Sequence, residues 1–236
     1  MKKYIPSIIT ACSILCGVLA IQLGDFYWSS ILIICSVILD TLDGFSARLL
    51  NATSEFGKQM DSFADIISFG MAPAYMYFLM APDDSFISTI VPSIIVLAGV
   101  IRLIIFNLSP SRPYFKGLPI PSCALFFLGI ILGYHNENHF IIDFFSIKFN
   151  YVFTALMMSG LMLAFPLRMF SLKGFSMTDH RSNIYLYALV GISVILLWFF
   201  SYPAIPLLVV TYVLLSIIYT ATTKVDPKLD QMPKVM

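Results

Sequence analysis

Long apolar runs separated by short polar breaks fill most of this 236-residue sequence. A helix that crosses the hydrocarbon core of a bilayer needs about 20 apolar residues, within a range of roughly 17 to 25. The pattern predicts an all-α fold: a polytopic integral membrane bundle of about eight transmembrane helices, with a six-helix core and two C-terminal helices. Only a short turn divides the last two runs, so seven helices are the alternative. The eight runs are 5–23, 28–50, 60–81, 87–108, 118–134, 149–168, 184–200 and 204–222.

The composition agrees with a membrane protein and excludes several other classes. Hydrophobic residues make up 59% of the chain, charged residues only 11%, and the mean hydropathy is +0.89. A soluble domain carries about 25% charged residues. The net charge of +1 does not favour a nucleic-acid partner. The four cysteines lie in apolar runs and lack the paired spacing that is typical of zinc sites.

The distribution of Lys and Arg predicts how the helices are oriented. Basic residues near helix ends are retained on the cytoplasmic side. With eight spans and a cytoplasmic N-terminus, thirteen of the fourteen basic residues lie inside and only Lys148 lies outside. We therefore expect a protein of the cell (inner) membrane with one transmembrane domain, residues 1–223, and a short cytoplasmic tail, 224–236. The inner set is Lys2, Lys3, Arg48, Lys58, Arg102, Arg112, Lys116, Arg168, Lys173, Arg181, Lys224, Lys228 and Lys234.

Four aspartates interrupt the second and third apolar runs. An ionised side chain inside a bilayer costs on the order of several kcal/mol unless it is paired, hydrated or bound to a cation. A lone acid there could be a helix cap or an interhelical hydrogen bond, but four together favour a functional site. The spacing i, i+3 on the first helix and i, i+4 on the next places each pair on one face. The four are Asp40, Asp43, Asp61 and Asp65.

Carboxylates gathered in this way favour divalent metal ions. A short turn at 51–56 joins the two helices, so the four side chains should face one another. Oxygen ligands without His or Cys suit hard ions such as Mg²⁺, Mn²⁺ or Ca²⁺. Four carboxylates exceed what one octahedral ion that keeps its waters would use, so we expect two metals, an arrangement that serves phosphoryl displacement. Gly44, Ala47 and Gly57 on the same faces permit either close helix packing or a flat ligand.

The same residues form a recognisable motif. They read Asp40-Thr-Leu-Asp43-Gly44-Phe-Ser-Ala47-Arg48, then eight residues, then Gly57-Lys-Gln-Met-Asp61-Ser-Phe-Ala-Asp65. This stretch resembles the signature of the CDP-alcohol phosphotransferases at all eight positions. The resemblance implies a membrane enzyme with two divalent cations, Mg²⁺ or Mn²⁺ with Ca²⁺ as a further occupant, that moves a substituted phosphate group from a CDP-linked donor to an alcohol and releases CMP.

The resemblance also implies roles for individual residues. Asp40, Asp43 and Asp61 match metal ligands, and Asp65 matches a residue that both holds metal and deprotonates the attacking hydroxyl. The positions that match the CDP-donor site are Thr10, Gly44, Ala47, Arg48 and Gly57. The family further suggests a homodimer.

Weaker features resemble the phosphatidylserine synthase branch of this family, over roughly residues 5–122. These are Pro6-Ser7-Ile-Ile-Thr10, Ile101-Arg102-Leu-Ile-Ile-Phe106-Asn107 and Gly117-Leu118-Pro119-Ile-Pro121. Ser7 departs from the usual Asn, and Ile105 replaces a second Arg. The branch implies CDP-diacylglycerol and L-serine as substrates and phosphatidylserine and CMP as products. The residues expected to bind the acceptor or phosphate are Arg102, Asn107, Arg112 and Lys116, although Arg102 and Arg112 could instead be positive-inside anchors.

Two other functions remain open on the sequence. A sister enzyme of the family would use glycerol 3-phosphate or an inositol phosphate as acceptor, and such acceptors call for a denser basic cluster. A divalent-cation transporter would also place carboxylates at membrane depth. No acid continues the route outward from the four aspartates, which argues against transport.

Overall fold

The computed structural model describes residues 4–50, 52, 54–108, 115–164, 168–169, 180–200 and 202–222, with the side chains of 115–116, 168, 180–183 and 200 excepted. Over these residues the fold is helical apart from one short antiparallel ladder, in which β1 pairs with β2. The elements are α1 (Ile5–Leu23), α2 (Phe26–Leu49), α3 (Glu55–Ala64), the π-helix η2 (Asp65–Met71), α4 (Ala72–Phe78), α5 (Phe86–Leu108), β1 (Phe115–Lys116), α6 (Ile120–His135), α7 (His139–Ser146), α8 (Lys148–Leu163), β2 (Arg168–Met169), α9 (His180–Phe200) and α10 (Ala204–Thr222).

Local sequence explains where the first helices begin and end. Gly24 has φ 59°, in the left-handed region that glycine adopts readily, and its N–H donates to Ala20 to end α1. The side chain of Asp25 then accepts the N–H of Trp28 and caps α2. Ser54 caps α3 by accepting the N–H of Gly57. α1 packs against both α2 and α3.

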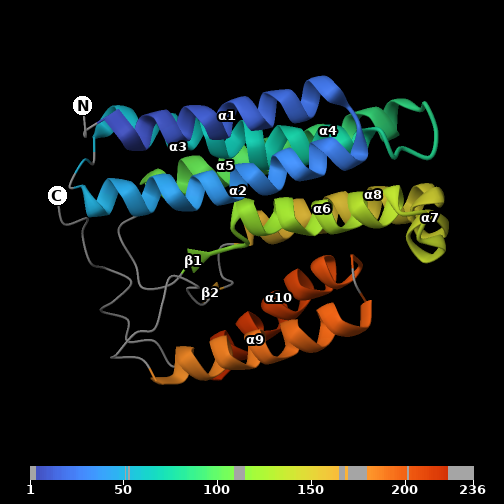
Figure 1. Ribbon diagram of the computed structural model, residues 1–236. Helices are drawn as coiled ribbons and strands as arrows, with labels where there is room; N and C mark the ends of the chain where they lie inside the picture. The colour runs from blue at the N-terminus through green and yellow to red at the C-terminus, as the bar shows by residue number, and fades with distance from the viewer. Residues whose placement is uncertain are drawn as a thin grey trace.

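The long helices run in alternating directions and pack as one bundle (Figure 1). α1 packs on α2, α5 on α8, and α10 on both α6 and α9. Tyr77 of α4 and Tyr151 of α8 stack in the core with ring centroids 4.4 Å apart, and the Tyr77 hydroxyl donates to the Tyr151 carbonyl. A Cβ at Gly129 of α6 would lie 3.0 Å from the backbone nitrogen of Pro206, so the last helix approaches the core closely.

The integral membrane character of the chain is confirmed, whereas the predicted count of eight spans is not. Within the described residues, four helices are long and apolar enough to cross a bilayer, and the bent pair α7 and α8, which meet at 94°, would make five. α6 and α8 have only 16 residues each, and the predicted run 60–81 is divided among α3, η2 and α4. The four candidates are α1, α2, α5 and α10.

One helix was not expected. Residues 135–148 lie between two of the predicted apolar runs, but His139–Ser146 forms α7, which Asn138 caps by accepting the N–H of Ile141. The predicted tail, residues 224–236, and the basic residues Lys2, Lys3 and Lys173 lie outside the described residues.

Candidate active site

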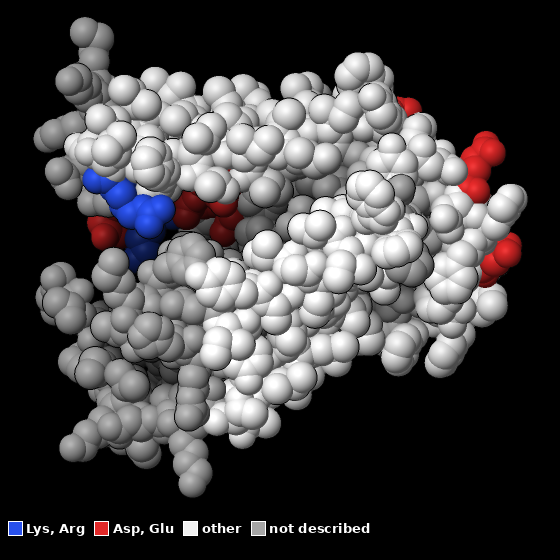
Figure 2. Space-filling view, turned by 60° about the horizontal axis from the view of Figure 1, so that its bottom comes forward, with Lys and Arg blue, Asp and Glu red and all other residues white. Residues whose placement is uncertain are grey.

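A cavity of about 480 Å³ opens between the first three helices, at the end of the bundle where α2 ends and α3 begins. We call this the site end. Figure 2 shows basic residues beside a hollow in which acidic side chains are visible, while further acids gather at the opposite, distal end. The cavity is lined by Pro6, Ser7, Thr10, Asp43, Gly44, Ala47, Ala52, Ser54, Glu55, Gly57, Lys58 and Asp61.

Three of the predicted aspartates converge. Each of Asp40, Asp43 and Asp61 offers a carboxylate oxygen within 4.8 Å of the other two. Asp43 is 5% exposed, and its Oδ2 accepts a hydrogen bond of 2.6 Å from the hydroxyl of Thr10 on α1. The helical spacing on α2 and α3 therefore brings together the side chains that the sequence predicted, and Thr10 holds one of them from a third helix.

Asp65 lies just beyond this group of three. It is the first residue of η2, and its backbone N–H points back to the carbonyl of Asp61. Asp40, Asp61 and Asp43 lie within electrostatic range of its carboxylate, and so does the cation of Arg102. Asp65 therefore faces the same group of acids from one helical turn further along.

The small residues of the motif border the cavity. Apart from its chain neighbours and the backbone of its own helix, no described atom lies within 4 Å of where a Cβ at Gly44 would stand, so close packing against another helix does not explain this glycine. At Gly57 a Cβ would lie 3.2 Å from Ser54 Oγ and 3.8 Å from Ser7 Oγ, both of which line the cavity. Of the two explanations for the small residues, close helix packing or a flat ligand, the structure thus favours the ligand, because there is room for one against the backbone.

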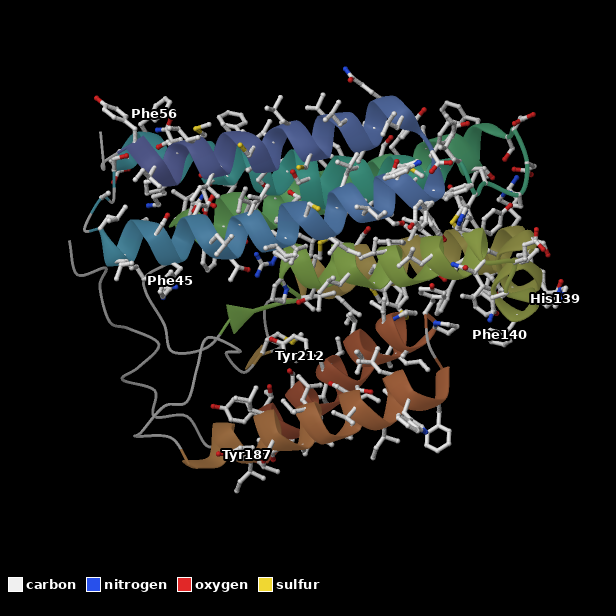
Figure 3. The ribbon with its side chains drawn as sticks, in the orientation of Figure 1. Phe45, Phe56, His139, Phe140, Tyr187 and Tyr212 are labelled. Carbon is white, nitrogen blue, oxygen red and sulfur yellow. The ribbon has the colours of Figure 1, made fainter. Side chains whose placement is uncertain are left out.

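The apolar faces of the same helices point elsewhere. Phe45 of α2 and Phe56 of α3 project away from the bundle, with 57% and 71% of their surface exposed (Figure 3).

Arg48 is exposed near the end of α2, where its Nε donates to the carbonyl of Gly44. A basic side chain at a helix C-terminus is favourable because the last carbonyls lack helical partners.

The residues predicted to bind the acceptor are only partly assembled. Arg102 of α5 is 6% exposed, its guanidinium lies 5.7 Å from the ring centroid of Phe106, and its Nε has no hydrogen-bond partner among the described residues. Asn107 donates to Ser62 Oγ at 2.9 Å, which links α5 to α3. Lys116 lies in β1 without a described side chain, and Arg112 lies outside the described residues.

Several residues of the site were not singled out from the sequence. Glu55 and Lys58 line the cavity beside the motif. Their position at the start of α3, next to the motif residues, could have indicated that they belong to the site. Tyr212 of α10 is 4% exposed, points toward the rest of the bundle (Figure 3) and lies within electrostatic range of Arg102. The sequence of α10 is apolar and lies far along the chain from the motif, so it did not indicate that Tyr212 lies near Arg102.

The donor set of the site suits a hard divalent cation. It consists of carboxylate oxygens from two adjacent helices, and the described hydrogen-bond partner of Asp43 is a neutral hydroxyl rather than a base. Such oxygen ligands are typical of Mg²⁺, Mn²⁺ and Ca²⁺ sites. The group Asp40, Asp43 and Asp61 is therefore consistent with metal binding.

Comparison with known proteins gives the family. Residues 3–166 match the CDP-alcohol phosphatidyltransferase family model. A CDP-diacylglycerol–serine O-phosphatidyltransferase of Helicobacter pylori is 41% identical over 143 residues, which cover 58% of this chain and 60% of that protein. The Bacillus subtilis protein of the same name is 36% identical over 52% of this chain and 72% of that protein. An archaetidylserine synthase of Methanothermobacter thermautotrophicus is 37% identical over 56% of this chain and 60% of that protein.

The match to the family model starts at α1 and reaches past α8, so it includes the residues that line the cavity and all four aspartates. The chain spans about 60% of the length of the Helicobacter relative. With a match over more than half of its residues, the chain belongs to the CDP-alcohol phosphatidyltransferase family.

Proposed function

We propose that this protein transfers the phosphatidyl group of CDP-diacylglycerol to the hydroxyl of L-serine, giving phosphatidylserine and CMP. The observation that carries the proposal is the convergence of Asp40, Asp43 and Asp61 on one cavity in a chain of this family. Serine as the acceptor is supported by the names of the relatives. One is a CDP-diacylglycerol–serine O-phosphatidyltransferase and another is an archaetidylserine synthase, so both names contain serine although the lipids differ.

The site would use divalent cations. Asp40, Asp43 and Asp61, together with Asp65, would hold two of them, Mg²⁺ or Mn²⁺, with Ca²⁺ as a further occupant. Bound there, the ions would neutralise the diphosphate of the donor and stabilise the departing CMP. The hydrogen bond from Thr10 would keep the Asp43 carboxylate turned toward the cavity.

The donor would enter the cavity beside Gly44, Ala47 and Gly57. The open space beside Gly44 lets a flat nucleotide approach the backbone of α2. Arg48, near the end of the same helix, adds a positive charge where phosphates would lie. Thr10 completes the donor side of the cavity from α1.

Asp65 would act as the general base. Its carboxylate takes the proton of the serine hydroxyl, and the serine oxygen forms a bond to the phosphorus that carries diacylglycerol. The bond between that phosphorus and the bridging oxygen breaks, and CMP leaves with the oxygen and its electron pair. Serine is a weak nucleophile, and a positioned base typically contributes about 10²- to 10⁴-fold to such a step.

Arg102 would bind the carboxylate of serine. It is buried, its Nε lacks a described hydrogen-bond partner, and it lies within electrostatic range of the proposed base. Asn107 would set the spacing of α5 and α3 through Ser62, and Arg112 and Lys116 would add positive charge. Arg102→Met should raise the KM for serine roughly tenfold or more, because a hydrogen bond to a charged group contributes about 1.5 to 3 kcal/mol. The KM for CDP-diacylglycerol should change little, and an unchanged KM for serine would remove Arg102 from the acceptor site.

The proposed reaction can be tested directly. Purified protein with CDP-diacylglycerol, Mn²⁺ or Mg²⁺ and labelled serine should yield labelled phosphatidylserine and CMP in equal amounts. A panel of acceptors should include glycerol 3-phosphate and inositol phosphate, because the sister enzymes remain the nearest alternative. CMP release that depends on one of these acceptors and not on serine would show that the acceptor is not serine. The transfer chemistry of the family would still hold.

A cation transporter is the remote alternative. A Cβ at Gly17 of α1 would lie 2.8 Å from the Ser68 backbone, on the distal side of the acids, so the helices are packed tightly where an ion would have to continue. Metal flux into proteoliposomes without CMP release would support transport.

We also propose the topology and assembly. Residues 1–223 would form one transmembrane catalytic domain of eight spans, with 224–236 as a cytoplasmic tail and both the N-terminus and the site facing the cytoplasm. Lys148, the one basic residue predicted to lie outside, is at the distal end, where it pairs with Asp83 in the loop before α5. A cysteine introduced at Asp84 should react with a membrane-impermeant reagent added outside intact cells. A homodimer, as the family resemblance suggests, should appear as a two-chain mass in detergent.

A further inference from the structure

α1 and the π-helix η2 approach each other tightly at Ser68, three residues beyond Asp65. A Cβ added to Gly17 would stand 2.5 Å from Ser68 Oγ and 2.8 Å from Ser68 Cα. Real Cβ atoms essentially never come within 3.0 Å of a non-bonded heavy atom of another segment, and the backbone of Ser68 cannot rotate away as a side-chain tip could. A side chain at position 17 would therefore push η2 away from α1.

Buried hydroxyl groups hold the same junction together. Ser68 Oγ donates to the carbonyl of Ser13 on α1 at 2.9 Å, and the hydroxyls of Ser13 and Ser36 lie 2.6 Å apart. All three serines are completely buried. Buried polar groups stay paired because an unpaired one costs about 1 to 3 kcal/mol. This network fixes η2 against α1 and, through Ser36, against α2.

The junction sets the position of Asp65 because η2 begins at that residue. A π-helix is a rare local rearrangement, usually a single turn inside an α-helix, and it changes which way the following side chains point. Here it runs from Asp65 to Met71, with Ser68 at its centre. The backbone that carries Asp65 is thus anchored to α1, whereas Asp40, Asp43 and Asp61 are carried by α2 and α3.

We infer that Gly17 and Ser68 are positioning residues that hold the Asp65 carboxylate in line with the acceptor hydroxyl. The inference rests on the proposed function of Asp65 as the base. It separates two tasks in one site: α2 and α3 carry Asp40, Asp43 and Asp61, which would hold metal, while the contact of α1 with η2 aims the base. Disturbing that contact should slow the chemical step and leave binding almost unchanged.

The first experiment compares Gly17→Ala with Gly70→Ala. Gly70 is buried in the same π-helix, but no described atom lies within 4 Å of a Cβ placed there. Gly17→Ala should lower kcat about 10²-fold, since a displacement of 1 Å can cost that much. The KM values for donor and serine should stay close to wild type, and Mn²⁺ affinity measured by electron paramagnetic resonance should fall much less than kcat, because Asp40, Asp43 and Asp61 lie on α2 and α3 rather than on η2. Gly70→Ala should retain most of its kcat.

A second pair keeps the inference testable if Gly17→Ala does not fold. Ser68→Ala adds no volume and removes the hydrogen bond to Ser13, and it should lower kcat several-fold with Mn²⁺ affinity retained. Ser159→Ala is the matched control, because Ser159 is also buried but its hydroxyl donates within its own helix, to Ala155. Ser159→Ala should keep wild-type kcat.

The outcomes distinguish this inference from the proposed function. Wild-type protein that releases no CMP with any acceptor contradicts the proposed function. The inference alone is contradicted when wild type turns over and Ser68→Ala matches Ser159→Ala. It is equally contradicted when Gly17→Ala loses Mn²⁺ affinity and kcat in the same proportion, since that pattern marks a general collapse of the site.

Discussion

The two ends of the bundle each hold buried or anchored aspartates, but they stabilise them by different means. At the distal end, Asp83 accepts hydrogen bonds from the hydroxyls of Ser88 and Ser85 and forms a 3.0 Å ion pair with Lys148 at the start of α8. At the site end, Asp43 lies with Asp40 and Asp61 within 4.8 Å and accepts from the neutral hydroxyl of Thr10. Asp83 is paired with a base, whereas the three aspartates at the site end lie close to one another.

This difference separates an acid with a structural role from acids with a chemical role. The hydroxyl groups of Ser85 and Ser88 and the ammonium group of Lys148 pair with the Asp83 carboxylate, so the chain itself supplies its partners. Lys148 also joins the loop before α5 to α8. Three carboxylates drawn together repel one another, and a cation from outside the chain would relieve that repulsion. Comparing variants at the two ends tests whether the separation is real.

The largest effect is expected for Asp43→Ala. Removing a buried carboxylate from the group of three should abolish metal-dependent donor binding and lower kcat/KM by roughly 10³-fold or more, since metal ions supply several kcal/mol of charge stabilisation. Mn²⁺ titration and CMP release measure the two losses. Metal binding that stays intact in this variant would mean that the ligands lie elsewhere.

Asp65→Asn should separate chemistry from binding. The amide keeps the shape of the side chain but cannot accept the serine proton, so turnover should fall by about 10²- to 10⁴-fold. Metal-dependent donor binding should be largely spared, in contrast to Asp43→Ala. Equal donor binding in the two variants would show that these aspartates do not divide the roles in this way.

A smaller effect is expected for Thr10→Val, which removes the hydroxyl that Asp43 accepts from. Groups that orient a metal ligand typically contribute about 10- to 100-fold to metal affinity, so Mn²⁺ should bind about tenfold more weakly. Thr211→Val is the control, because Thr211 is only partly buried and its hydroxyl bonds only to its own helix among the described contacts, at Leu207. Equal affinities in the two variants would make Thr10 a packing residue.

The sequence predicted much of this arrangement because its signals are local. Apolar length and helical spacing are properties of short segments, so the positions of most helices and the shared face of Asp40 and Asp43 followed directly. The spacing of Gly57, Asp61 and Asp65 likewise placed the third carboxylate near the first two.

Features that depend on contacts between distant segments could not be predicted. Nothing in Asp65–Met71 alone distinguishes a π-helix from an α-helix, because the register is stabilised by Ser13 and Gly17, about 50 residues earlier. The eight residues of α7 are too few to span a bilayer and were taken for a loop. The burial of Arg102 near Tyr212 depends on α10, which lies beyond the family match.

The smallest effect is expected at the distal end, from Asp83→Asn. Hydrogen bonds from Ser88 and Ser85 and the ion pair with Lys148 hold the pKa of Asp83 well below its usual range. A carboxylate with a depressed pKa stabilises the folded state at pH values above its unfolded pKa, near 3.9, and that stabilisation is lost as the pH falls through the folded pKa. Asp83→Asn should therefore lower the Tm slightly at pH 7, and the difference from wild type should shrink below about pH 4.

Asp84→Asn, one residue away and without a hydrogen bond among the described residues, should leave the Tm unchanged at both pH values. kcat should be the same in wild type and both variants, because exposed ion pairs contribute little to stability and this one lies at the opposite end of the bundle from the cavity. A large loss of turnover in Asp83→Asn would show that the distal loop influences the site, and the two ends could then no longer be treated as independent.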